Sequence, residues 1–323
     1  MVITMRQAVP ETALMPGPRG RRLWLRVKRQ KWLLLMLLPA FICIVLFNYL
    51  PLSGWYVAFS EYRLGSSLFG GQFVGLKYFA KIFQESSDLV YLIRNTLVMN
   101  GVTLILNLAV ALFLAILLKE ARWKAGAKIT QTVTFFPYFV SWVIAYSIVW
   151  SLLAANSGAI NQALVQMGVL EKGINILGDP KYSWQLIILL NLWKFTGYNT
   201  IIFLSSIAGI PSEQYEAAAL DGAGRFQQIR YVTLPNLMPT ASVLLIMNAG
   251  WILTSNLEQF FIFSNSTNWS RMEVLDMYIY KFGLKMLDFP YSTAMSIVKT
   301  FVSILLLLFV NWLTRRMSKS SIL

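Results

Sequence analysis

Six long stretches of the chain consist mainly of apolar residues. A helix needs about 20 residues to cross the hydrocarbon core of a bilayer, because that core is about 30 Å thick and each residue adds about 1.5 Å. Each stretch reaches this length, so the sequence predicts an all-α membrane protein with six transmembrane helices. We place these helices at residues 33–52, 96–118, 129–153, 184–209, 239–263 and 291–313.

The composition is typical of a membrane protein. Of the 323 residues, 57% are hydrophobic and only 13% are charged, which is too apolar for an ordinary soluble domain. The net charge of +14 does not indicate a nucleic-acid partner, because most bases lie just outside the apolar stretches and not on one amphipathic element. We therefore expect membrane lipid around the chain and no nucleic acid.

Several kinds of chemistry are disfavoured by the residues that the chain lacks. It has no His, and its single cysteine, Cys43, lies in an apolar run, so neither a disulfide framework nor a Cys/His metal site can be built. A Walker A pattern is missing, and paired carboxylates on the water side are scarce. A membrane-embedded enzyme is therefore disfavoured, and we predict no catalytic residue, no metal ligand and no cofactor in this chain.

The distribution of basic residues predicts the orientation. An even number of spans puts both termini on one side. The segments on that side hold 17 Lys and Arg residues and the other loops hold 9, so both termini should be cytoplasmic. The predicted organisation is a basic cytoplasmic tail at 1–32, a transmembrane domain at 33–313 with a cytoplasmic loop at 210–238, and a cytoplasmic tail at 314–323. A cleaved signal peptide is disfavoured, because the first apolar run has full spanning length.

The cytoplasmic loop between the fourth and fifth spans carries strong local signals. Pro211 suits the first turn of a helix. Gly222 and Gly224 predict a bend, and Asp221 could cap the next turn through its carboxylate. Pro235 should then stop a second short helix. A plain connector would need only a few residues, so we predict a helix-bend-helix at the membrane surface.

The same loop resembles the EAA loop of the permeases of binding-protein-dependent ABC importers. Its pattern is Glu-Ala-Ala from residue 216, three residues, Gly222, nine residues, and then Val-Thr-Leu-Pro from residue 232, where the family has Ile in place of Val232. In that family the loop forms a coupling helix that docks on a cytoplasmic ATPase. The resemblance assigns to ATPase coupling the residues Glu216, Ala217, Ala218, Asp221, Gly222, Leu234 and Pro235. Asp221 acting only as a helix cap stays an alternative.

Other motifs are similar to a subgroup named after lipoprotein-associated polysaccharide permeases. They are FVGLKYF at 73–79, RNTL at 94–97, FFPYFVSW at 135–142 and a long block at 193–225. The resemblance implies import of oligosaccharides across the bacterial inner membrane, including fragments of acidic polysaccharides such as pectin or alginate. It also implies a second permease as heterodimer partner, an extracytoplasmic solute-binding protein, and two ATPase subunits that hold ATP and Mg. The alternatives are import of a non-sugar solute and a stand-alone channel or secondary transporter.

Three charged residues lie inside the predicted spans: Lys194, Glu258 and Lys299. Each would cost about 2.5 to 3.5 kcal/mol facing lipid, so each should face the bundle or a water-filled path. Helical spacing puts polar residues on one face of the fourth, fifth and sixth spans, and we predict that these faces enclose one cavity. The candidate solute-path residues are Lys194, Tyr198, Trp251, Ser255, Glu258, Ser296 and Lys299.

Two structural alternatives remain for these residues. Glu258 could neutralise Lys194 or Lys299, and the serines of the sixth span could serve close helix packing. The excess of lysine over acid favours an anionic sugar, although by one unit of charge. Pro39 and Pro137 remove helix hydrogen bonds and predict kinks in the first and third spans.

Overall fold

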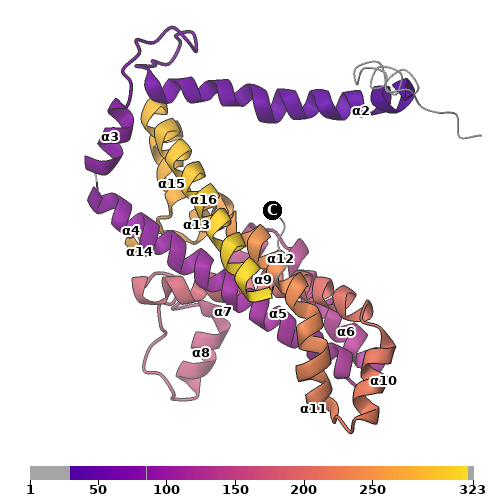
Figure 1. Ribbon diagram of the computed structural model, residues 1–323. Helices are drawn as coiled ribbons and strands as arrows, with labels where there is room; N and C mark the ends of the chain where they lie inside the picture. The colour runs from indigo at the N-terminus through magenta and orange to yellow at the C-terminus, as the bar shows by residue number, and fades with distance from the viewer. Residues whose placement is uncertain (1–29, 85, 319–323) are drawn as a thin grey trace, which may run out of the picture. The chain divides into compact units, whose positions relative to one another are not determined.

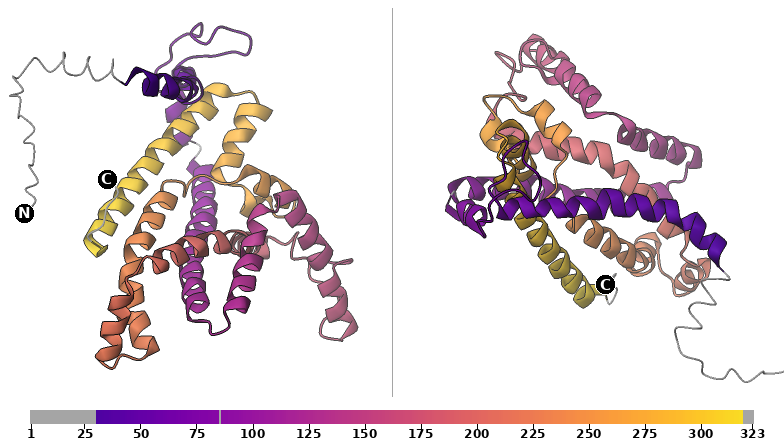
Figure 2. Two further views of the ribbon diagram at one scale, coloured as in Figure 1. Left: turned by 90° about the vertical axis from the view of Figure 1, so that its right-hand side faces the viewer. Right: turned by 90° about the horizontal axis from the view of Figure 1, so that it is seen from above.

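The computed structural model of the protein describes residues 30–84 and 86–318. It divides into two compact units, Met1–Trp55 and Tyr56–Leu323. Apart from one isolated bridge between Ser60 and Phe73, the described residues form helices and loops, as Figures 1 and 2 show. The predicted all-α class is therefore confirmed. Most of the predicted N-terminal tail and the last residues of the C-terminal tail lie outside the described residues.

The described part of the first unit is one helical run. Helix α2 (Lys31–Ile44) continues through a π-helical turn, η1 (Val45–Tyr49), into η2 (Leu50–Phe59), which extends past the end of the unit. Pro39 lies inside α2, which continues on both sides of it. The whole run has 29 residues and is apolar enough to cross a membrane. It contains the predicted span 33–52 and extends beyond its C-terminal end.

Four long helices form the centre of the second unit. Helix α5 (Val102–Glu120) packs along α9 (Pro180–Ala208), and α12 (Leu234–Ala249) packs against α16 (Phe289–Ser318) as well as against α5 and α9. Small residues let α5 and α9 approach closely. One buried cluster joins three of these helices: Ala111, Ala115, Phe203, Ile207, Leu237 and Leu244. The predicted spans 96–118, 184–209 and 291–313 are thereby confirmed, with ends that shift by a few residues.

The predicted third span, 129–153, is wrong as a continuous helix. Helix α6 (Lys124–Phe135) is followed by a short turn, η4 (Phe136–Phe139), and α7 (Trp142–Leu153) leaves at 108° to α6. Pro137 explains the end of α6, because it lacks the N–H that a continuing helix would need. Ser141 starts α7, since its hydroxyl accepts a hydrogen bond from the Ile144 N–H at 3.3 Å.

The predicted fifth span, 239–263, is also wrong in its C-terminal half. Helix α12 ends at Ala249, and a short helix, α13 (Leu257–Phe263), begins only after a non-helical segment at 250–256. Asn256 caps α13, because its side-chain oxygen accepts from the Gln259 N–H at 3.2 Å. The segment is apolar enough for a membrane, but it does not continue the helix.

Pro235 does not stop the preceding helix as predicted. Helix α11 (Arg225–Gln228) passes through a π-helical turn, η5 (Ile229–Thr233), directly into α12, and Pro235 lies in the first turn of α12. A wider turn before the proline gives room for its ring and for the missing N–H. The helical run from Arg225 to Ala249 is therefore long enough to cross a membrane.

The segments predicted to face outward contain short helical elements, some of which pack into a second buried cluster. These elements include α8 (Ala159–Gln166), α14 (Trp269–Met272), α15 (Leu275–Tyr280) and η6 (Lys281–Lys285). Residues from α14 and α15 join α7, α9 and α13 in this cluster, which contains Trp142, Ile187, Phe260, Met272 and Met277 among others. These loops are therefore packed parts of the second unit.

The motif FVGLKYF ends the first of these loops. Its Phe73 forms the bridge to Ser60, and its Lys77, at the start of α3 (Lys77–Gln84), lies 2.6 Å from Glu61 Oε1. The hydrogen bond and the charge of Lys77 lower the pKa of the Glu61 carboxyl. The motif thus closes the loop between η2 and α3.

Candidate coupling segment and solute cavity

The candidate coupling segment is α10 (Ser212–Leu220) with the turn that follows it. Gly222 has a φ of +82°, in the left-handed region where any residue with a Cβ atom has a strained backbone. Its N–H donates to the Ala219 carbonyl at 3.0 Å, and the Ala223 N–H donates to the Ala218 carbonyl at 2.9 Å. This is a glycine-terminated helix end, so the predicted bend at Gly222 is confirmed and has a backbone reason.

Asp221 does not cap the next helix. Helix α11 begins after Gly224, whose N–H donates to Gln227 Oε1 at 2.8 Å. Asp221 ends α10, and its own N–H donates to the Ala217 carbonyl at 3.0 Å. The alternative of a pure N-terminal cap is therefore wrong, and the exposed carboxylate stays available for the predicted docking role.

Helix α10 is attached to two membrane helices by polar contacts. The Tyr215 hydroxyl lies 3.0 Å from Thr233 Oγ1 at the base of α12, and Lys119 Nζ of α5 lies 3.6 Å from the centre of the Tyr215 ring. Asn236 Nδ2 donates to Gln214 Oε1 at 2.8 Å. A displacement of α10 would therefore act directly on the ends of α5 and α12.

The coupling segment also exposes large apolar side chains. Leu220 is 89% exposed and Phe226 is 75% exposed, on either side of the turn. Glu216 and Ala217 are exposed as well. Exposed apolar residues next to a polar helix are typical of a protein interface. The motif did not point to Leu220 and Phe226, although large apolar residues in a polar loop were a visible signal.

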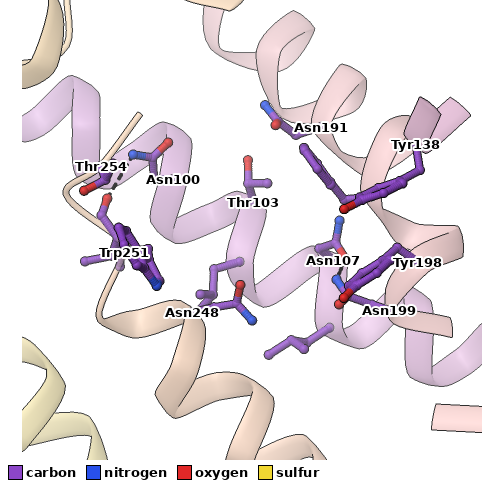
Figure 3. A pocket seen from close by; sticks show the side chains of 14 residues that line it. Asn100, Thr103, Asn107, Tyr138, Asn191, Tyr198, Asn199, Asn248, Trp251 and Thr254 are labelled. Carbon is purple, nitrogen blue, oxygen red and sulfur yellow. Dashed lines mark hydrogen bonds between the residues drawn. The ribbon is translucent and has the colours of Figure 1, made fainter. Parts of the chain in front are cut away.

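A cavity of about 380 Å³ lies between α5, η4, α9 and the end of α12. Figure 3 shows its side chains, which converge from these elements. Tyr198 and Trp251, two of the predicted path residues, both line it. The other prominent lining residues are Asn100, Thr103, Asn107, Tyr138, Asn191, Asn199, Asn248 and Thr254.

The walls of this cavity are neutral, polar and aromatic. The rings of Tyr138 and Tyr198 stack with centres 4.8 Å apart, and Asn199 Nδ2 donates to Asn107 Oδ1 at 2.5 Å. None of the lining residues, all within the described part of the chain, carries a charge. Amides can form hydrogen bonds with hydroxyl groups, and aromatic rings can pack against sugar rings. These uncharged residues cannot form an ion pair with an anion.

Lys194 does not line the cavity, which corrects its predicted place on the path. Its side chain is buried, and Nζ donates to the carbonyls of Pro137 at 3.4 Å, Tyr138 at 3.1 Å and Val140. These carbonyls belong to the end of η4, where the helix bends. A cation at a helix C-terminus satisfies carbonyls that have no partner within the helix. Lys194 therefore holds the bend between α6 and α7.

The serine-rich face of α16 lines a different cavity, of about 410 Å³. Ser296 and Lys299 lie there with Asp276 of α15, and Trp251 and Thr254 belong to both cavities. The prediction that the three polar faces enclose one cavity is therefore wrong, because the segment after α12 lies between two of them.

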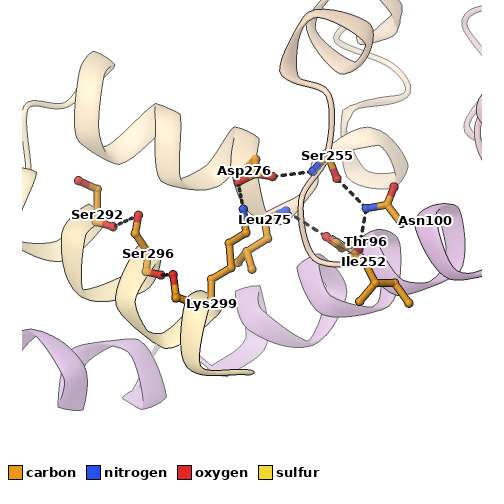
Figure 4. Close-up of polar contacts among 10 residues, drawn as sticks. Thr96, Asn100, Ile252, Ser255, Leu275, Asp276, Ser292, Ser296 and Lys299 are labelled. Atoms are coloured by element: carbon orange, nitrogen blue, oxygen red, sulfur yellow. Dashed lines mark hydrogen bonds and ion pairs between the residues drawn. The ribbon is translucent and has the colours of Figure 1, made fainter. Parts of the chain in front are cut away.

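A chain of polar contacts begins at Lys299 and Asp276 in the wall of this second cavity, and Figure 4 shows its members. Lys299 Nζ lies 2.5 Å from Asp276 Oδ1, and the other carboxylate oxygen accepts from the Ser255 N–H at 2.7 Å. Asn100 Nδ2 donates to Ser255 Oγ at 3.0 Å and to the Ile252 carbonyl at 2.9 Å. The chain thus joins α16, α15, the segment after α12 and η3 (Leu97–Gly101).

Among the described residues, Glu258 forms no direct ion pair with either lysine, although its charge acts on Lys194. Lys299 pairs with Asp276, which the sequence places in a loop, and Lys194 binds backbone carbonyls. Glu258 is exposed in the first turn of α13 and, among the described residues, lines neither cavity. Ser255 lies in the non-helical segment, so the helical spacing from which it was placed does not hold there.

The long apolar helices, the polar cavity and the exposed coupling turn define the membrane-embedded subunit of a transport system. The family described as binding-protein-dependent transport system inner membrane component matches residues 107–319. The chain belongs to this family and is an integral protein of the inner membrane, which confirms the resemblance drawn from the EAA-type motif.

Individual relatives narrow the comparison. The chain is 36% identical over 304 residues to the polygalacturonan/rhamnogalacturonan transport system permease protein YteP of Bacillus subtilis (strain 168), covering 94% of each chain. It is 35% identical over 296 residues to protein LplB of the same organism, covering 92% of each. It is also similar to a chain in the crystal structure of a bacterial alginate ABC transporter in complex with alginate pentasaccharide-bound periplasmic protein. For that chain the TM-score is 0.84 and the identity 32%, with 93% of this chain and 100% of that one covered.

Proposed function

We propose that this chain is one of two permease subunits in an ATP-driven importer of oligosaccharides derived from acidic polysaccharides. The observation that carries the proposal is the continuous connection from coupling segment to cavity. Helix α10 is bonded to Thr233 and Asn236 at one end of α12, and Asn248 near the other end lines the cavity. A push on α10 can therefore change the cavity through a single rigid helix.

This geometry and the family support the partners that we propose. Leu220 and Phe226 fit an apolar groove on a cytoplasmic ATPase, with Glu216, Ala217, Ala218 and Asp221 beside them. Two such ATPases would hold ATP and Mg, since the chain has no Walker A pattern. A second, related permease would complete the pore, and an extracytoplasmic binding protein would deliver the sugar. Both termini and the coupling segment lie in the cytoplasm in this arrangement.

The substrate class is supported by the cavity and by the relatives. Asparagine amides and aromatic rings match the hydroxyl groups and ring faces of a sugar. The names of two of the relatives refer to polygalacturonan, rhamnogalacturonan and alginate, which are acidic polysaccharides. The lysines inside the spans give no further support for an anionic sugar, because Lys194 and Lys299 are both engaged within the protein.

The test compares two glycines of the coupling turn in the reconstituted transporter with both permeases, both ATPases and binding protein. Gly222→Ala forces a strained φ, at a cost of about 1 to 2 kcal/mol, whereas Gly224 has a φ of −72° that alanine adopts freely. We expect Gly222→Ala to lower ATP hydrolysis stimulated by oligosaccharide-loaded binding protein about tenfold. Gly224→Ala should remain close to the unmodified transporter.

Uptake and ATP hydrolysis by the same reconstituted transporter test the proposed function as a whole. Acidic oligosaccharides such as trigalacturonate should stimulate ATP hydrolysis and enter proteoliposomes only when ATP is present. Equal activity of the two glycine variants would remove the coupling role of the turn. Uptake that persists without the ATPases would favour a stand-alone channel or secondary transporter.

A further inference from the structure

The motif RNTL at 94–97 fixes one helix to a distant loop. Asn95 and Thr96, in α4 (Ser86–Thr96), are fully buried. Asn95 Nδ2 donates to the carbonyls of Ser270 and Glu273, at 3.0 Å each, and the Leu275 N–H donates to Thr96 Oγ1 at 3.1 Å. These bonds account for Asn95 and Thr96, but they leave the guanidinium of Arg94 unexplained.

Arg94 and Arg271 meet at one tryptophan. The guanidinium carbon of Arg94 lies 5.5 Å from the centre of the Trp184 ring, and that of Arg271 lies 4.6 Å from the same ring. Trp184 is held in place, because its Nε1 donates to the Arg271 carbonyl at 3.0 Å. Three elements, α4, α9 and α14, thus present two cations around a fixed ring.

No carboxylate in the described part of the chain pairs with either guanidinium. Neighbouring Glu273 is buried and already binds the Tyr91 hydroxyl, with Lys281 Nζ at 3.7 Å. Arg94 is exposed, and it donates a hydrogen bond only to Asn95, at 3.4 Å. Two guanidiniums beside the same ring, without a carboxylate partner among the described residues, favour an anion next to that ring, since guanidinium and carboxylate form strong paired hydrogen bonds.

We propose that Arg94 and Arg271, positioned by Trp184, form a subsite for a carboxylate of the incoming acidic oligosaccharide. The inference rests on the proposed function, because it assumes an acidic sugar. It separates two tasks within the subunit. The neutral cavity contacts the hydroxyls and ring faces of the sugar. The two arginines lie on the side of the membrane where α9 begins, and they attract the negative charge of the sugar before it enters the cavity.

The experiment uses the complete reconstituted transporter with Arg94→Gln, Arg271→Gln and the double variant. Arg63→Gln is the matched control, since Arg63 is an exposed arginine of the first loop without an aromatic partner of this kind. Uptake is measured with trigalacturonate and with its methyl ester, which has the same rings without charge, each presented on the binding protein. We expect the double variant to lower uptake of the acid about tenfold and to leave uptake of the ester within twofold.

Arg94→Lys and Arg271→Lys retain the charge and should recover part of the uptake, which separates charge recognition from folding. Equal loss for acid and ester would show that the arginines serve packing or lipid headgroups, and it would overturn the inference. Normal uptake of the acid by the double variant would overturn it as well. If the unmodified transporter takes up neither sugar, the proposed function fails first, so the two failures are distinguishable.

Discussion

The bend between α6 and α7 and the segment between α12 and α13 both interrupt a helix in an apolar part of the chain. At the bend, one side chain, Lys194 of α9, binds three carbonyls at the end of η4, of which, within the described residues, only that of Pro137 also accepts a backbone hydrogen bond, from the Val140 N–H. In the segment after α12, Asn100 binds the Ile252 carbonyl and Asp276 accepts from the Ser255 N–H. Several elements therefore supply the hydrogen-bond partners of the segment after α12.

The difference has a physical basis. The end of a helix exposes carbonyls alone, so a single cation can satisfy it, and its charge is balanced by the helix dipole. The segment after α12 exposes both an N–H and a carbonyl, which need an acceptor and a donor. Asp276 supplies the acceptor and needs Lys299 as its counter-charge. The bend should thus depend on one residue, whereas the second break should tolerate paired changes.

Lys194→Met should give the largest loss of stability. It leaves the partly buried carbonyls of Tyr138 and Val140 without the Lys194 donor, at a cost of about 3 kcal/mol in the free energy of unfolding. The measurement is the thermal midpoint of the purified protein in detergent. Lys181→Met is the control, because Lys181 lies on the same helix and is exposed. Equal midpoints for the two variants would contradict the role of Lys194.

Asp276→Asn should cost about 2 kcal/mol, because it leaves the partly buried Lys299 without its counter-charge. Lys299→Met should also destabilise the protein, but Asp276→Asn combined with Lys299→Met should recover most of the loss, because the Asn oxygen can still accept from the Ser255 N–H. Unfolding measured for the two single variants and the double variant gives the coupling energy. Losses that simply add would mean that the pair does not act as a unit.

The positions of the spans could be predicted from hydropathy, but the two breaks could not. Residues 250–256 begin with Gly-Trp-Ile-Leu, which is as apolar as a continuing helix, and hydropathy does not report whether the backbone continues. Pro137 did signal a kink, although not a 108° bend. In the coupling turn, glycine is itself the signal, and the bend at Gly222 was predicted correctly.

The candidate site was harder to predict for a related reason. Lys194 was placed on the path because a charge in a membrane needs a partner. Its partners are backbone carbonyls, which every residue has, so the sequence does not show which of them lie near Lys194. Asp276 lies in a segment predicted to be a loop, so it was not considered as the partner of Lys299. Tyr198 and Trp251 line one cavity as expected, because Tyr198 lies in a regular helix and Trp251 follows only two residues after the end of α12 at Ala249.

Gly197→Ala and Gly101→Ala should show that the backbone packs more closely near the bend than near the segment after α12. A Cβ at Gly197 would lie 2.2 Å from the Thr134 carbonyl oxygen of α6, whereas one at Gly101 would meet only the end of the Ile252 side chain, at 3.6 Å. We expect Gly197→Ala to cost about 2 kcal/mol through overpacking against backbone. Gly101→Ala should be neutral or slightly stabilising, since alanine favours helix. Equal effects on the thermal midpoint would contradict the close approach of α9 to α6.

The smallest expected effects come from substitutions of the helix caps, which both breaks have in common. After each break a new helix begins with a side-chain cap: Ser141 accepts from the Ile144 N–H at 3.3 Å, and Asn256 accepts from the Gln259 N–H at 3.2 Å. Ser141→Ala and Asn256→Ala should each cost about 1 kcal/mol. The midpoints of the two variants should agree, because both caps serve one N–H at the start of a short helix. A much larger loss for Asn256→Ala would mean that the segment after α12 depends on this one residue, and the contrast between one essential side chain at the bend and a shared network at the second break would no longer hold.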